Sequence, residues 1–114
     1  MDKHLIKKEE MIIQLNTDNN IDENEMLEVF VNTSITDELA RFKDHITRVK
    51  VHLSDKSGDK TGMKDKRCML EASLGNREPI AVVCNSDTIE HALFDTLEKL
   101  NVFMKTTESK LKYR

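Results

Sequence analysis

The segment 79–100, PIAVVCNSDTIEHALFDTLEKL, constrains the fold most strongly because its hydrophobic period changes in a single step. Residues 80–84 alternate in a two-residue repeat that is typical of a short, largely buried strand, and Pro79 suits the first position of that strand. The next apolar residues recur every three or four positions, and these are Ile89, Ala92, Leu93, Leu97, Leu100 and Met104. They predict a helix that must bury one face, most simply against a sheet.

Two helices are predicted. The helix after residue 86 begins at Asp87, which can cap its first turn, with Glu90 completing a capping box, and it runs to about residue 110. The other helix spans about 24–45, and acidic residues near its start suit the positive end of the helix dipole. The weak helix formers at 33–36 favour a kink in its middle. Its apolar face consists of Leu27, Phe30, Val31, Ile35, Leu39, Phe42 and Ile46.

Three further strands are predicted, at 11–16, 48–53 and 68–74. The strand at 48–53 alternates strictly, so we expect one face buried and the other exposed. The segment 54–65 holds two of the three glycines and has no periodicity, which predicts a mobile loop.

Residues 75–78 are short enough to join the last two strands as a hairpin. If Cys68 lies opposite Cys84, Leu70 faces Val82 and Ala72 faces Ile80. This register places every apolar partner on the core side and makes the two thiols neighbours inside the core.

The resulting order is β-α-β-β-β-α, which predicts an α+β fold with a four-stranded sheet and both helices packed on one face. We expect a flexible N-terminal segment at residues 1–10 and a single domain over residues 11–114. No apolar run reaches the length of a membrane-spanning helix, and residues 1–10 lack a signal-peptide core. We therefore expect a cytoplasmic protein without a membrane partner.

The sequence offers little to support catalysis. It lacks a glycine-rich phosphate loop, a nucleophile elbow and a zinc signature, so we expect no enzyme, no metal, no cofactor and no small-molecule substrate. Cys84 and His91 could form an activated thiolate, but we expect Cys84 to be a buried structural thiol. A redox sensor that uses Cys68 and Cys84 stays open as a third class of function.

The chain resembles the family of ribosome hibernation-promoting factors and ribosome-associated translation inhibitors, also called sigma-54 modulation proteins, in its short form. The resemblance covers about residues 11–112 and rests on IIQLNTDNNI, VKVHL, CMLEASLG, PIAVVCNSD and DTIEHALFDTLEKL, in this order. It implies a double-stranded-RNA-binding-like domain that docks between the head and body of the small ribosomal subunit. There it would overlap the messenger and transfer RNA sites and stop translation under stress.

The resemblance also implies basic side chains along both helices that face ribosomal RNA. The matching positions here keep Lys99, Lys110 and Lys112, with Lys105 displaced by one position. Other usual basic positions in the second helix carry Val102, Thr106 and Glu108. In the first helix, Ser34, Asp37 and Glu38 occupy the region where basic residues are expected.

The candidate RNA-binding residues are Lys99, Lys105, Lys110 and Lys112, with Lys66 and Arg67 as secondary candidates. Further basic residues cluster around the end of the first helix, at Arg41, Lys43, Arg48 and Lys50. All of them could instead be an ordinary solvated surface, because acidic residues intersperse them and the net charge is −3.

An acidic run extends over residues 18–28 without a basic residue between its members, and Asp37 and Glu38 follow later. The simplest interpretation is that these carboxylates stabilise the start of the first helix. It could also be a patch for a basic ribosomal protein, or a device that weakens RNA binding.

These observations lead to one expected function and one alternative. We expect non-catalytic binding to the RNA of the small ribosomal subunit, which blocks the decoding channel and lowers translation. The alternative is a diverged relative that has lost the RNA-binding face and acts as a protein-interaction or stress-regulatory module. An acidic potential across the two-helix face would favour this alternative.

Overall fold

The computed structural model describes residues 11–56 and 65–112. It confirms the predicted order of strands and helices and the α+β class. The elements are β1 (Ile12–Thr17), α1 (Glu25–Glu38), the 3-10 helix η2 (Ala40–Phe42), β2 (Arg48–Asp55), β3 (Lys66–Ser73), β4 (Ile80–Ser86) and α2 (Ile89–Lys112).

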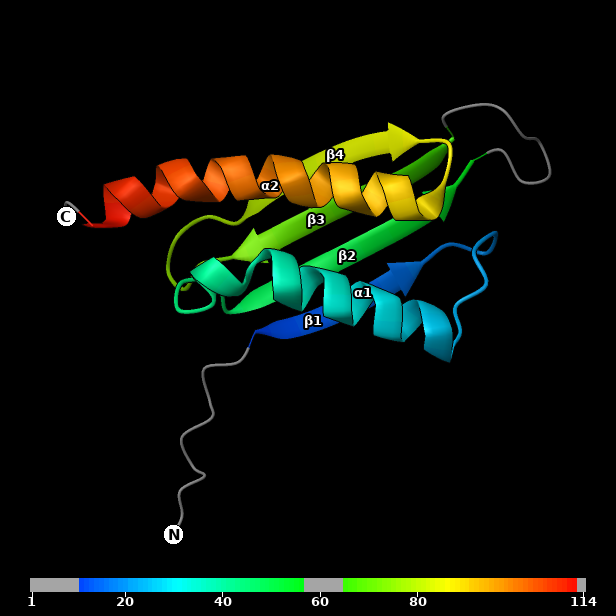
Figure 1. Ribbon diagram of the computed structural model, residues 1–114, viewed down its shortest axis with the longest axis horizontal. Helices are drawn as coiled ribbons and strands as arrows, with labels where there is room; N and C mark the ends of the chain where they lie inside the picture. Colours follow the sequence, from blue (N-terminus) through cyan, green and yellow to red (C-terminus); the bar gives the residue numbers. More distant parts are fainter. Residues whose placement is uncertain (1–10, 57–64, 113–114) are drawn as a thin grey trace, which may run out of the picture.

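The four strands form one mixed sheet in the order β1-β2-β3-β4. β1 and β2 are parallel, and the other neighbours are antiparallel. The parallel pair requires a crossover, which α1 provides (Figure 1). Both helices cover the same face of the sheet, α1 over β1 and β2 and α2 over β3 and β4, and both begin at the same end of the molecule (Figure 1).

The predicted hairpin register is confirmed. Cys68 pairs with Cys84, Leu70 with Val82, and Ala72 with Ile80. The β3 members of these pairs are fully buried beneath the helices, whereas Cys84 is only half-buried. The turn between the strands contains Gly75 at φ +69°, a conformation that side chains with a Cβ rarely adopt.

The core lies between the sheet and the two helices. The predicted stripe of α2 forms its larger part, because Leu93, Leu97, Leu100 and Met104 are at most 1% exposed. Phe42 of η2 is the largest fully buried side chain. The remaining core consists of Val31, Ile35, Leu39, Ile46, Val49, Val51, Leu53, Cys68, Leu70, Ala72, Leu74, Val82 and Ala92.

The helix starts differ in how well they match the prediction. α1 begins as expected, since the Asn24 side chain accepts a hydrogen bond of 2.9 Å from the Leu27 N–H. The expected cap of α2 is wrong: Thr88, not Asp87, accepts from the His91 N–H at 3.0 Å. Asp87 instead accepts a hydrogen bond from the Ser86 hydroxyl, so Glu90 is not part of a capping box.

The first helix is shorter than predicted and has no break at residues 33–36. α1 ends at Glu38, and the chain continues through Leu39 into η2 rather than to residue 45. The Asn101 amide donates to the Glu38 carbonyl at 2.9 Å, so a side chain of α2 satisfies a carbonyl that has no intrahelical partner at this helix end. Phe42 and Ile46 are buried all the same, so the apolar spacing alone could not reveal the end of α1.

The strands β2 and β3 are longer than predicted. Residues 54 and 55 belong to the predicted loop but extend β2, and Asp55 lies opposite Lys66 in the ladder. An ion pair of 3.4 Å between these two side chains links β2 to β3 at this end of the sheet. The rest of the predicted mobile loop, at 57–64, and the predicted flexible segment at 1–10 lie outside the described residues.

Truncating the α2 stripe tests this account of the core. Leu97→Ala is expected to lower the free energy of unfolding by about 2–5 kcal/mol, because it removes a side chain that is 1% exposed and leaves a cavity. Val102→Ala is the control, since Val102 is 61% exposed on the same helix and its truncation should change stability by no more than about 0.5 kcal/mol. Urea unfolding measures both, and equal losses would contradict the assignment.

Candidate nucleic-acid interface

Two of the predicted lysines of α2 lie on its side toward β4. The Lys99 ammonium donates a hydrogen bond of 3.2 Å to the Val83 carbonyl. Lys110 follows about three helical turns later, so it leaves α2 on nearly the same side. Both residues are exposed, and they can reach the same phosphate backbone along the flank of the molecule.

Lys105 lies on the other side of α2, toward α1. Asn101, one turn earlier, marks this side because its amide donates to the Glu38 carbonyl at 2.9 Å. Lys105 is exposed. Lys112 is the last residue of α2, and its side chain is not among those described.

The secondary candidates Lys66 and Arg67 are separated by the sheet. Successive strand residues point to opposite faces, so Lys66 lies on the helix side with Cys68, whereas Arg67 points to the uncovered side. The Lys66 side chain is only 19% exposed and its ammonium pairs with Asp55. The structure therefore does not bring these two residues into one surface with the lysines of α2.

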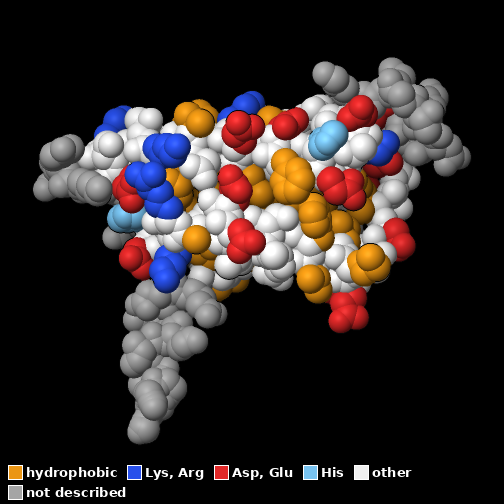
Figure 2. Space-filling view, viewed as in Figure 1, with side chains coloured by type: hydrophobic (Ala, Val, Ile, Leu, Met, Phe, Trp, Pro, Cys, Tyr) orange, Lys and Arg blue, Asp and Glu red, His pale blue; other side chains and the backbone are white. Residues whose placement is uncertain are grey.

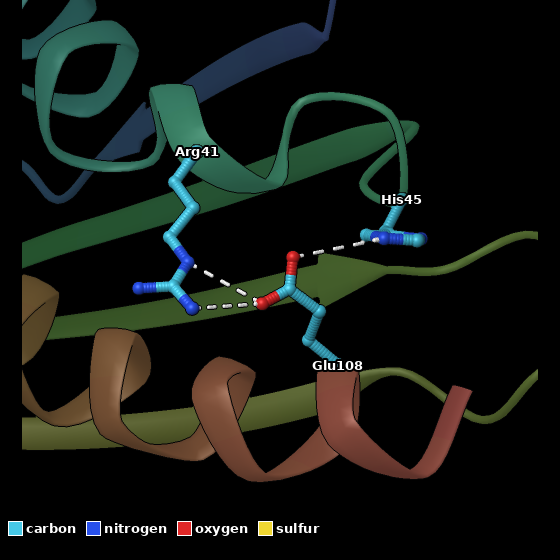
Figure 3. A network of polar contacts seen from close by, with 3 residues as sticks. All are labelled: Arg41, His45 and Glu108. Carbon is cyan, nitrogen blue, oxygen red and sulfur yellow. Dashed lines mark hydrogen bonds and ion pairs between the residues drawn. The ribbon is translucent and has the colours of Figure 1, made fainter. Parts of the chain in front are cut away.

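A polar network joins η2 to the end of α2 (Figure 3). Arg41 donates to one carboxylate oxygen of Glu108 from Nε at 3.3 Å and from Nη2 at 3.0 Å. His45 Nε2 lies 4.0 Å from the other oxygen. Glu108 is 12% exposed, and it neutralises the cation of Arg41 at a position where the resemblance implies a basic residue.

The sequence alone did not show that three further basic residues share one surface. Arg48 and Lys50 share the uncovered face of the sheet with Arg67, because Val49, Val51 and Leu53 of β2 all point into the core. The strict alternation of residues 48–53 carried this signal. Glu71, which is the ladder partner of Lys50, reduces the positive charge of this face.

Charge is segregated along the two-helix face. Residues 22–40 hold six acidic residues and residues 87–98 hold four, without a Lys or Arg in either range. In Figure 2, most Lys and Arg side chains gather at the end of the face where α2 finishes, and acidic side chains are scattered over the whole face. Carboxylates therefore dominate the starts of both helices, whereas the far end combines Arg41, Lys43 and Lys105 with Asp37 and Glu38 at the end of α1.

The thiols do not form a reactive site. Burial raises the pKa of Cys68 to about 12, against a smaller lowering by a hydrogen bond with Thr96. The His91 imidazole lies 3.7 Å from the Asp87 carboxylate, and within the described residues no hydrogen bond joins it to Cys84. Hydrogen bonds from its own backbone N–H and from the Ser86 hydroxyl lower the pKa of Asp87.

The described part of the chain shows no other reactive centre. No three His, Cys, Asp or Glu side chains within residues 11–56 and 65–112 are grouped so that they could hold a metal ion. None of the helices in these ranges has both the length and the apolar character needed to cross a membrane. The surface of exposed cations thus remains the candidate site.

Comparison with solved structures identifies the fold. A ribosomal subunit interface protein from Coxiella burnetii matches with a TM-score of 0.69 at 16% sequence identity, over 87% of this chain and 99% of that one. The N-terminal domain of Protein Y from Thermus thermophilus matches with a TM-score of 0.69 at 18% identity, over 85% of this chain and 99% of that one. This chain has the fold of both proteins.

The shared fold extends over nearly the whole of both neighbouring chains. No protein-family model matches the chain, and no curated protein matches it. The likeness therefore lies in the arrangement of strands and helices, and the functional residues have to be judged on their own positions.

Alkylation tests the environment of the two cysteines. At pH 8 iodoacetamide is expected to modify Cys84 in the folded protein and to modify Cys68 only after unfolding, because the Cys68 thiol is fully buried and stays protonated below its raised pKa. Peptide mapping by mass spectrometry separates the two sites. Equal modification of both cysteines in the folded state would contradict the structure and reopen the redox hypothesis.

Proposed function

We propose that this protein belongs to the ribosome hibernation-promoting factor family. In this proposal it binds the RNA of the small ribosomal subunit in the cytoplasm, occupies the decoding channel and lowers translation without catalysis. The observation that carries the proposal is the set of exposed lysines on two sides of α2, on a fold shared with a ribosomal subunit interface protein and with Protein Y.

Physical chemistry favours α2 as the RNA-contacting element. Lys99, Lys105 and Lys110 present exposed ammonium groups that can contact phosphates and release counterions. The helix is held rigidly by its buried stripe, so these groups keep a fixed spacing. Phosphate contacts carry no base sequence, and recognition of folded RNA would then depend on shape.

The charge segregation sets the orientation of this proposed complex. The starts of both helices carry carboxylates and would be repelled by phosphates, whereas the end of α2 and η2 carries Arg41, Lys43 and Lys105. We therefore expect the C-terminal half of α2 to face the RNA and the helix starts to point away from it.

A second function is favoured by the same acidic surface. A diverged relative that has lost ribosome binding would act as a protein-interaction or stress-regulatory module, and the carboxylates on residues 22–40 and 87–98 suit this role. Salt-insensitive association with ribosomes, or none, together with an unchanged rate of translation, would favour this second function.

Paired lysine substitutions test which surface contacts RNA. Lys99→Gln combined with Lys110→Gln is expected to lower affinity for the small subunit and to reduce the slope of log K against log salt by about 1 to 2, because two phosphate contacts are lost. Arg48→Gln combined with Lys50→Gln is the matched control on the uncovered face of the sheet. Affinity is measured by filter binding across a salt series, and an effect confined to the control pair would move the interface to the sheet.

Removing the carboxylate of Glu108 tests the role of the network in Figure 3. Glu108→Gln is expected to raise affinity for the small subunit about two- to tenfold, since the guanidinium of Arg41 is then available to phosphate. Inhibition should become stronger by a similar factor in a reconstituted translation assay. Weaker binding by a variant that keeps its fold would show that Glu108 positions Arg41 for RNA instead of competing with it.

A further inference from the structure

An apolar patch lies across the first halves of α1 and α2, at the end of the molecule away from Arg41, Lys43 and Lys105. Met26 is 82% exposed, Val29 58% and Phe94 50%. The ring of Phe30 meets the ring of Phe94 edge-on, with centroids 5.8 Å apart, and so joins the two helices. Figure 2 shows hydrophobic side chains gathered on this half of the two-helix face, with acidic side chains around them.

A groove of about 510 Å³ opens beside the patch. Its apolar walls come from the first turns of both helices and from the segment before α1, namely Ile21, Met26, Leu27, Phe30 and Ile89. Asp22 and Glu90 stand among the polar residues that line it. The groove can accept a bulky apolar side chain, and Met26 can adjust its shape to such a guest.

Three carboxylates around the patch form no ion pair with a cation among the described residues. Glu25, Glu28 and Glu90 are exposed, and within the described residues none of them forms an ion pair with a Lys or Arg. Glu25 also lines the small hollow formed with Met26, Val29 and Phe30. The ammonium of Lys66 lies at the neighbouring end of the sheet, where it pairs with Asp55.

We propose that this patch and groove bind a cationic amphipathic helix of a partner protein. An apolar side chain of the partner fills the groove, its neighbours one turn away cover Val29 and Phe94, and its Lys or Arg residues meet the surrounding carboxylates. Large exposed apolar patches with a polar rim mark interaction sites, and a helix in a groove presents anchors at this spacing. The inference goes beyond the proposed RNA contact, because it concerns the opposite end of the helices.

The negative charge around the patch distinguishes between its possible occupants. A second copy of this chain would bring the same carboxylates face to face across a symmetric interface, which is unfavourable. RNA would bring phosphates toward them, which is equally unfavourable. A cationic amphipathic helix offers both an apolar side chain for the groove and positive charge for the carboxylates. Of these three candidates, it is the one that matches the surface.

The test is a titration of the full-length, isotope-labelled protein with an amphipathic peptide of Lys and Leu, about four helical turns long. Saturable shifts of the amide resonances are expected at Met26, Val29 and Phe94, and binding should weaken as salt rises. A peptide with Ser in place of every Lys should bind at least about tenfold more weakly, because it lacks the cations. Equal binding by the Ser peptide, or shifts confined to the basic end of α2, would overturn the proposal.

Two pairs of matched variants locate the binding site. Phe94→Ala and Phe103→Ala remove aromatic rings that are each 50% exposed on α2, and only Phe94→Ala is expected to weaken peptide binding, by about tenfold. Val29→Ser and Val102→Ser repeat the comparison without disturbing the ring pair, at 58% and 61% exposure. Equal losses within both pairs would overturn the proposal.

The titration also separates this inference from its competitors. Shifts at Met26 and Val29 when the protein alone is diluted would show that a second copy covers the patch, which contradicts the proposed occupant. The experiment contains no ribosomes, so its failure and a failure of the proposed RNA binding are recognised independently.

Discussion

Burial of the apolar stripe of α2 against β3 and β4 is the interaction on which the rest of the structure depends. Leu93, Leu97 and Leu100 are at most 1% exposed, and burying each such side chain stabilises the fold by about 1.5–3 kcal/mol. The stripe fixes the rotation of α2 about its own axis. It therefore also decides that Lys99 leans toward β4 and that Lys105 lies toward α1.

The same packing brings the starts of both helices to one end of the molecule, and this creates the polarity of the two-helix face (Figure 1). Carboxylates stabilise a helix start, and the shared direction of α1 and α2 gathers Glu25, Glu28 and Glu90 at one end. The last turn of α1 has no basic residue, so the cations of the other end come from η2, the residues after it and α2. One end is then suited to phosphates and the other to a cationic protein segment. Glu108 moderates the basic end because it holds the guanidinium of Arg41.

Much of the fold could be predicted from the sequence because the apolar residues follow the periods of strands and helices. The register Cys68–Cys84 followed from apolar alternation alone. The end of α1 did not, since Phe42 and Ile46 keep a helical spacing through a 3-10 turn. Of the candidate site, the positions of the lysines along α2 could be predicted, whereas the pairing of Arg41 with Glu108 depends on residues 67 positions apart in the chain.

Co-sedimentation of the purified protein with small ribosomal subunits and with whole ribosomes, across a salt series, tests the central claim most directly. The account predicts near-stoichiometric binding at low salt that falls steeply as salt rises, because lysine contacts with phosphates release counterions. Absence of binding at low salt would contradict it.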